Sequence, residues 1–215
     1  MEKFKKIYRK ILRVKRDYIN KKRLKNDQFT IFSSNCIGGV IYNSLGKQFL
    51  SPTINVYFDA PDFILFLKNP EKYLSTEPQL IETLSIKYPV VQIDDIKIYC
   101  VHYSSFDHFI EDWNKRKARI NWNNIFLMMS ERDGCTDKDI EEFEQLPYAN
   151  KVIFVSEPMP HFKSAYYIEG SEVYNSQKKQ VGTLTSFKSK YSGKRIIDDF
   201  DYVSFLNREG NCEEK

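Results

Sequence analysis

The sequence predicts an α/β protein with a mixed, mainly parallel sheet, helices on both faces in a three-layer arrangement, and a basic amphipathic helix at the N-terminus. Strand-like and helix-like segments alternate along the chain, which is typical of a sheet with crossover helices. Two strand-like runs, 124–130 and 151–157, are almost continuously apolar, as strands covered on both faces are. A predicted hairpin around Asp94 and Asp95 makes the sheet mixed.

The first 28 residues are predicted to form a basic helical arm. Residues 1–27 hold twelve Lys and Arg against three acidic residues, a net charge of +9, whereas the remainder carries a net charge of −5. Apolar residues recur along the arm at helical spacing: Phe4, Ile7, Tyr8, Ile11, Leu12, Val14, Tyr18 and Ile19. Such a helix can lie on an anionic membrane, where each basic residue contributes about 1 kcal/mol. It can also pack its apolar stripe on the body of the protein or on a second copy.

The remainder is expected to form a single α/β domain over residues 29–207, followed by a flexible tail at 208–215. Hydrophobic residues make up 41% of the chain, enough for a sizeable core. There is no apolar run of about 18 residues and no secretory signal, and the four cysteines form no CxxC pair and no zinc-like spacing with the histidines. We therefore expect a cytoplasmic protein, peripheral at the inner face of the plasma membrane. No nucleic acid partner is expected, because the body is acidic and carries no recognised nucleic-acid motif.

The elements of the body follow from local patterns. Gly46 suits a helix C-cap, Asn69-Pro70 ends or kinks a helix, and Thr136 suits an N-cap followed by acidic residues. The region 158–199 is polar with weak periodicity, so short strands and long loops are expected there. The expected order elsewhere is strand 29–33, helix 37–46, strand 53–58, broken helix 60–75, hairpin 90–103, helix 105–121, strand 124–130, helix 136–146, strand 151–157 and helix 201–207.

The turn between the first strand and the first helix of the body is the main candidate for a functional site. It carries Ser34, Asn35 and Cys36 directly before Gly38 and Gly39. Unpaired N–H groups at a helix start favour an anion, so this turn can bind phosphate or lower the pKa of a thiol. The glycines would let a substrate approach the backbone closely. Neither a G-x-G-x-x-G pattern nor a Walker loop is present.

Three interpretations of this turn remain open. In the first, Cys36 is a nucleophile, His102 its base and Asp133 the orienting group, an order compatible with papain-like arrangements. In the second, the turn binds a diphosphate together with basic residues, and an Asp199-x-Asp201 pair holds a divalent cation with a nucleotide sugar. In the third, the turn is structural and the protein is a non-catalytic partner. The basic residues offered for the second interpretation are Arg116, Lys117, Arg119 and Arg132.

Several phrases carry a family resemblance. They are "SSNCIGGVIYNSLG", "SPTINVYFDAPDFILFLKNPEKYL", "VHYSSFDHFIEDWNKRKARINWNNIFLMM", "LPYANKVIFVSE" and "GKRIIDDFDYVSFLN". The chain resembles a bacterial exopolysaccharide-biosynthesis family whose members open with S-N-N-C-x-G-G, with Ser34 in place of the first Asn. The resemblance covers residues 29–207 and leaves the arm outside. A looser similarity, through an S-N-C-x-x-G opening, is to papain-like cysteine hydrolases.

The resemblance implies a role in making capsule or exopolysaccharide. The expected substrates are then a nucleotide sugar or a lipid-linked glycan, and Ser34, Asn35, Gly38, Gly39 and Arg132 are the expected phosphate-binding residues. The sequence analysis favours a transferase acting on a sugar, with glycosyl transfer preferred to acyl transfer. A Cys36-dependent acyltransferase or hydrolase and a non-catalytic partner of the polysaccharide machinery are the alternatives.

Overall fold

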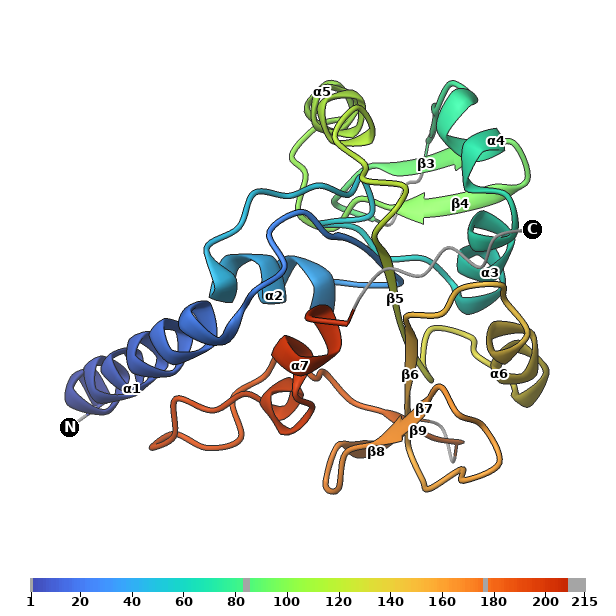
Figure 1. Ribbon diagram of the computed structural model, residues 1–215. Helices are drawn as coiled ribbons and strands as arrows, with labels where there is room; N and C mark the ends of the chain where they lie inside the picture. Colours follow the sequence, from blue (N-terminus) through green and yellow to red (C-terminus); the bar gives the residue numbers. More distant parts are fainter. Residues whose placement is uncertain (1, 83–85, 176–177, 209–215) are drawn as a thin grey trace.

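A computed structural model describes residues 2–82, 86–175 and 178–208, and its centre is a four-stranded parallel sheet. The strand order is β1-β5-β6-β7, and the pairing of β1 with β5 begins at Thr30 opposite Ile125 (Figure 1). The chain must cross over between every neighbouring pair, as parallel pairing demands. The strands of this sheet are β1 (Thr30–Ser33), β5 (Ile125–Ser130), β6 (Lys151–Val155) and β7 (Ala165–Tyr167).

Two smaller antiparallel sheets flank the central one. The first has the order β2-β3-β4, and its β3–β4 turn contains Asp94 with a positive φ of 54°. The second is the hairpin β8–β9. These strands are β2 (Gln79–Ile81), β3 (Val90–Ile93), β4 (Ile96–Tyr99), β8 (Glu172–Asn175) and β9 (Lys178–Val181).

The helices begin and end where local signals place them. Gly46 closes α2 with a left-handed φ of 64°, and Thr136 and Asp139 form a capping box at the start of α6. Pro70 separates α3 from α4. The helices are α1 (Glu2–Arg23), α2 (Ile37–Leu45), α3 (Ala60–Lys68), α4 (Pro70–Ser75), α5 (Phe106–Lys117), α6 (Asp137–Glu144) and α7 (Tyr202–Leu206), with a 3-10 turn at Ile196–Asp199.

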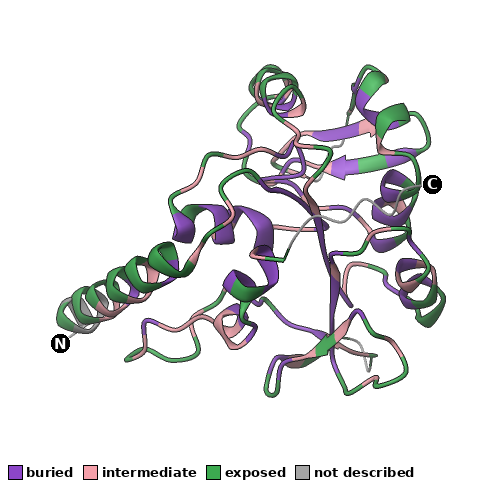
Figure 2. Cartoon of the chain, in the orientation of Figure 1, coloured by how far each residue is buried: buried purple, intermediate pink, exposed green. Residues whose placement is uncertain are grey.

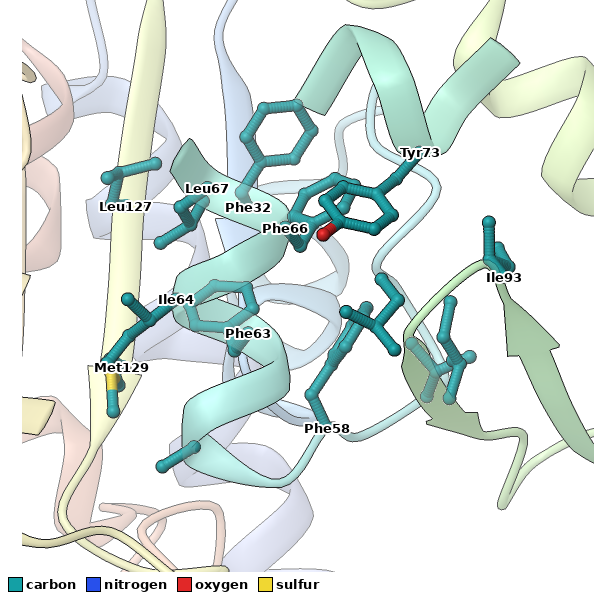
Figure 3. Packing of buried hydrophobic residues seen from close by; sticks show 14 of the residues in the cluster. Phe32, Phe58, Phe63, Ile64, Phe66, Leu67, Tyr73, Ile93, Leu127 and Met129 are labelled. Carbon is teal, nitrogen blue, oxygen red and sulfur yellow. The ribbon is translucent and has the colours of Figure 1, made fainter. Parts of the chain in front are cut away.

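Both faces of the central sheet are covered, which confirms the predicted three-layer α/β class. Alternate residues of β5 enter two separate cores: Leu127 and Met129 on one face, Phe126 and Met128 on the other. Figure 3 shows α3 packing on the first face, with Ile64 directed toward Met129 of β5. Helices α2 and α7 cover the second face.

The expected strand at 53–58 is wrong. This segment forms turns, Asn55 has a positive φ of 69°, and Tyr57 makes a bridge to Tyr99 rather than a continuous ladder. The alternating apolar residues that suggested a strand point into the core all the same: Ile54, Val56 and Phe58 are fully buried. A segment in which every second residue is apolar can therefore be irregular, if it packs against helices and the sheet.

Helix α1 projects from the body at its N-terminal end and is docked on it by polar contacts (Figure 1). Arg13 donates to Asp198 Oδ2 at 2.6 Å and to Ser44 Oγ at 2.6 Å, and Asn20 donates to the hydroxyl of Tyr202 at 2.8 Å. Arg13 is 7% exposed. The helix is therefore held through its polar face.

The opposite, apolar face of α1 faces solvent, as the exposed colouring in Figure 2 shows. The expectation that this stripe packs on the body is therefore not met. No helix among the described residues is long and apolar enough to cross a membrane. The exposed apolar residues of α1 are Phe4, Ile7, Tyr8, Ile11, Val14, Tyr18 and Ile19. The predicted tail at 208–215 lies outside the described residues except for residue 208.

Candidate functional site

A cavity of about 630 Å³ opens where β1 and β5 end. The carboxyl edge of a parallel sheet is where α/β proteins place their ligands, because the loops that follow the strands converge there. The segments that line this cavity are the β1–α2 turn, the turn after β4, the turn after β5 and the segment after β9. The residues are Asn35, Cys36, Ile37, Val40, Tyr57, His102, Ser130, Arg132, Asp133, Gly182, Thr183, Leu184, Thr185 and Arg195.

The turn between β1 and α2 satisfies most of its own amides. Asn35 Oδ1 accepts from the N–H of Ile37 at 3.2 Å, and Ser33 Oγ accepts from the N–H of Gly38 at 3.3 Å. Asn35 Nδ2 donates to Ser130 Oγ at 2.7 Å, which ties the turn to the end of β5. The expected niche of free amides for a phosphate is thus largely filled by side chains of the turn itself.

The two glycines have a packing role, and Ser34 does not line the cavity. A Cβ on Gly38 would lie 3.0 Å from Ser33 Cβ and 3.2 Å from Ile54 Cδ1, and one on Gly39 would lie 3.1 Å from Ile54 Cγ2. Both glycines are buried, and Ser34 is 4% exposed. The expectation that Gly38 and Gly39 admit substrate to the backbone is therefore corrected: they let α2 approach the 51–58 segment.

Cys36 and His102 meet at the wall of the cavity. Cys36 Sγ lies 3.2 Å from His102 Nε2, within reach for proton transfer. Cys36 is half-buried and His102 exposed. The turn that carries His102 is placed by the bridge between Tyr57 and Tyr99, whose rings stack with centroids 4.4 Å apart. This bridge connects the end of β4 to the segment that packs against α2.

The electrostatic surroundings keep the thiol protonated. Burial raises the pKa of Cys36, while Arg132 and the backbone N–H of Cys36 oppose this and Asp133 adds to it. A thiol pKa lowered by the helix start was one expectation, and the structure gives the opposite direction. A thiol with a raised pKa is protonated at neutral pH, so any reaction through this sulfur would require a group such as the neighbouring imidazole to accept its proton.

Asp133 lines the cavity but does not stand behind His102. It has a positive φ of 54°, its carbonyl accepts from the N–H of Ala60 at 2.8 Å, and its Oδ2 accepts from Arg132 Nε at 3.0 Å. Burial raises the pKa of Asp133 although Arg132 lowers it. Within the described part of the chain no hydrogen bond joins Asp133 to His102, so the arrangement is a Cys–His pair beside an Arg132–Asp133 ion pair.

Arg116 and its basic neighbours on α5, offered for a diphosphate, lie away from the cavity. Arg116 is 6% exposed and donates to the carbonyl of Ile54 and to the hydroxyl of Tyr103, so it is a structural residue. Lys117 donates to the carbonyl of Leu74, and Arg119 is exposed outside the cavity lining.

The Asp199-x-Asp201 pair is also engaged elsewhere. Asp199 forms ion pairs with Lys188 and Lys194. Asp201 caps α7 by accepting from the N–H of Ser204 at 3.2 Å, and it pairs with Arg23 at 2.5 Å. Asp201 therefore joins the C-terminal segment to α1, Asp199 pairs within that segment, and neither residue lines the cavity.

One wall of the cavity was missed by the sequence analysis. The segment after β9 contributes Thr183, Thr185 and Arg195. Arg195 stands in the phrase "GKRIIDDFDYVSFLN" but was not proposed as a site residue, and all three residues lie in the region expected to form short strands and long loops. Glu131 positions this wall, because its carbonyl accepts from the N–H of Val181 at 2.9 Å just after β5 ends. The signal was absent because the pairing is between segments distant in sequence.

The fold and site define an α/β protein with a Cys–His pair in a cavity at the carboxyl edge of a parallel sheet. The chain belongs to the family described as Domain of unknown function (DUF1919), whose model matches residues 7–207. A relative from Haemophilus influenzae strain Rd, described as an uncharacterized protein, is 41% identical over 210 residues, which cover 96% of this chain and 99% of the relative. The family match begins inside α1 and therefore includes most of the arm.

Proposed function

We propose that this protein is a cysteine-dependent acyltransferase that modifies a sugar in cell-surface polysaccharide synthesis, with hydrolysis of the acyl group as its side reaction. The observation that carries the proposal is the 3.2 Å contact between Cys36 Sγ and His102 Nε2 in a cavity of about 630 Å³. Such a volume accommodates a small-molecule substrate.

The first half-reaction forms a thioester on Cys36. Cys36 Sγ attacks the carbonyl carbon of the acyl donor, and the thiol proton passes to His102 Nε2, which must be the unprotonated ring nitrogen. As the bond to the leaving group breaks, His102 returns that proton to the leaving group.

The second half-reaction reverses these roles. An acceptor hydroxyl gives its proton to His102 Nε2 and attacks the thioester carbonyl. The C–S bond breaks, Cys36 leaves as thiolate, and His102 returns the proton to its sulfur. A sugar hydroxyl as acceptor gives transfer, and water as acceptor gives hydrolysis.

A sugar acceptor follows from the resemblance to the exopolysaccharide-biosynthesis family. A nucleotide sugar or a lipid-linked glycan supplies the hydroxyl in this proposal. Acyl transfer is preferred to glycosyl transfer because the amides of Ile37 and Gly38, which would bind a diphosphate, already serve Asn35 and Ser33.

The test is detection of an acyl-enzyme. The full-length protein is incubated with p-nitrophenyl acetate and p-nitrophenyl butyrate, release of p-nitrophenol is followed for a burst, and intact and peptide masses locate the acyl group. We expect a burst and an acyl group on Cys36. Cys36→Ala abolishes both.

Cys100→Ala is the matched control for this experiment. Cys100 is a buried thiol outside the cavity, and burial raises its pKa to about 12. This variant should show an unchanged burst. Acylation that persists in Cys36→Ala, or a wild-type protein that none of these esters acylates, would discard the proposal.

We also propose that α1 holds the protein on the anionic inner face of the plasma membrane. The apolar stripe of α1 is exposed, with Phe4 80% and Ile11 61% accessible, while the polar face is anchored through Arg13. Lysines and arginines surround the stripe within a segment of net charge +9. Apolar burial in the interface and attraction to anionic lipid then act together.

The membrane proposal is tested by co-sedimentation of the full chain with vesicles. Vesicles containing phosphatidylglycerol should retain the protein, and pure phosphatidylcholine vesicles should retain less. Ile7→Glu with Ile11→Glu should abolish retention. Leu80→Glu with Tyr174→Glu, which changes two exposed apolar residues elsewhere, should leave it intact. Equal retention of both double variants would remove the membrane assignment.

A further inference from the structure

The cavity has a cationic side that the proposed acyl transfer does not use. Arg132 follows β5, and Arg195 comes from the C-terminal segment. The hydroxyls of Thr183 and Thr185, on the segment after β9, line the same cavity. Two arginines and two threonines therefore line the same cavity as Cys36.

Arg195 is placed in this wall by the backbone around it. The N–H of Arg195 donates to Asp198 Oδ2 at 2.7 Å, and the N–H of Ile197 donates to the carbonyl of Leu184 at 2.9 Å. The guanidinium lies over the ring of Phe187, 5.3 Å from its centroid. The side chain is therefore half-buried and supported on an aromatic face.

Arg195 forms no ion pair with a carboxylate among the described residues. Its Nε is buried without a hydrogen-bond partner, and none of the ion pairs between described residues includes its guanidinium. Asp198, which accepts from the backbone N–H of Arg195, is paired with Arg13 at 2.6 Å. Burial lowers the pKa of Arg195 and the charge of Arg13 adds to this, while Asp198, Asp17 and Tyr202 oppose it.

The other charges of the cavity do not compensate it. Asp133 is the carboxylate among the lining residues, and it is paired with Arg132 at 3.0 Å. Among the arginine and aspartate residues of the lining, Arg132, Arg195 and Asp133, there is therefore one positive charge in excess. A half-buried cation without an ion-pair partner is stabilised by a ligand that supplies the anion.

We propose that Arg195, assisted by Arg132 and the hydroxyls of Thr183 and Thr185, binds a phosphate group of the substrate that reacts at Cys36. A guanidinium matches a phosphate with two parallel hydrogen bonds, and threonine hydroxyls can donate to the remaining oxygens. This inference rests on the proposed function because it takes Cys36 as the reacting group. The phosphate is then bound by the segment after β9 and the C-terminal segment, and not by the β1–α2 turn.

The test compares two alkylating agents at Cys36. Iodoacetate carries a negative charge and iodoacetamide does not, so the ratio of their rates, normalised to the unfolded protein, reports an anion-binding wall near the sulfur. Rates are read from the Cys36 peptide by mass spectrometry. Pyrophosphate is added as a competitor, with sodium acetate at the same ionic strength as its control.

We expect the normalised ratio to favour iodoacetate in the wild-type protein. Arg195→Gln should lower the ratio about five-fold while leaving the iodoacetamide rate unchanged, and Arg195→Lys should restore part of it. Arg119→Gln removes the same charge from an exposed site outside the cavity and should leave the ratio unchanged. Pyrophosphate should protect Cys36 from iodoacetate, and acetate should not.

Two results would overturn the inference: the same ratio in Arg195→Gln and Arg119→Gln, or no protection by pyrophosphate. Failure of the proposed function is a separate result. If no acyl-enzyme forms, the acyltransferase assignment is lost, whereas the alkylation ratio still reports whether Arg195 attracts an anion to this cavity.

Discussion

Cys36 Sγ and His102 Nε2 lie 3.2 Å apart although 66 positions separate them in the chain. Two independent structural units make this contact: the turn from β1 into α2, and the turn that follows β4. The bridge between Tyr57 and Tyr99 joins them, so the pair is set by the packing of the antiparallel sheet against the central one.

Removal of the imidazole should slow acylation without abolishing substrate binding. His102→Gln takes away the group that accepts the thiol proton, and general-base catalysis contributes about 10²- to 10⁴-fold. The burst rate with p-nitrophenyl acetate is the measurement. His108→Gln is the control, since His108 is exposed at the start of α5 and outside the cavity. Equal burst rates in the two variants would exclude His102 as the base.

The pH dependence of alkylation should report the buried thiol. Because burial raises the pKa of Cys36, its reaction with iodoacetamide should accelerate with an inflection above that of the unfolded protein. Asp133→Asn removes a negative charge that raises this pKa, so the inflection should fall; Arg132→Gln removes a positive charge that lowers it, so the inflection should rise. Asp107→Asn, an exposed change on α5, should do neither. Shifts in the reverse directions would contradict the electrostatic assignment.

The glycines of the β1–α2 turn should prove to be packing residues. Gly38→Ala places a Cβ 3.0 Å from Ser33 Cβ and 3.2 Å from Ile54 Cδ1, and overpacking of this kind costs about 1–3 kcal/mol. The midpoint of urea unfolding should fall accordingly. Adding Ile54→Val removes the Cδ1 methyl and should recover part of the loss. If Gly38→Ala is as stable as the wild type, the packing account of this glycine is wrong.

The ion pair between α1 and the body should be a main determinant of stability. The side chains of Arg13 and Asp198 are 9% and 1% exposed, so Asp198→Ala leaves a buried guanidinium without its closest partner. The cost should be about 3 kcal/mol, because Arg13 retains Asp17 at 2.8 Å. Glu142→Gln, which breaks a surface pair with Lys68, should cost about 1 kcal/mol or less. Chemical denaturation of both variants gives the comparison.

The helices and strands were predicted well because helix caps and turns depend on a few residues that are adjacent in the sequence. Gly46, Pro70 and Thr136 each end or begin a helix as expected. The segment 53–58 was misassigned because alternating burial is shared by strands and by irregular segments, and its outcome depends on distant partners.

The site was predictable only in part, for the same physical reason. Cys36 and His102 could be anticipated because each directly follows a predicted strand, although β1 and β4 belong to different sheets. The packing role of Gly38 could not be predicted, because Ile54, against which it packs, belongs to a different segment of the chain. The place of Arg195 in the cavity wall could not be predicted either, since it depends on Asp198 and on backbone hydrogen bonds within a loop region.

Asp198 Oδ2 accepts both from the Arg13 guanidinium and from the N–H of Arg195. Trimming residues 1–28 to obtain a smaller protein would therefore strip the counter-charge from a buried acid and disturb the wall beside Cys36. The N-terminal helix therefore cannot be removed without affecting the rest of the protein. Experiments on this family should keep the N-terminal helix attached, and a function lost on shortening the chain should first be examined as damage to the cavity that contains Cys36.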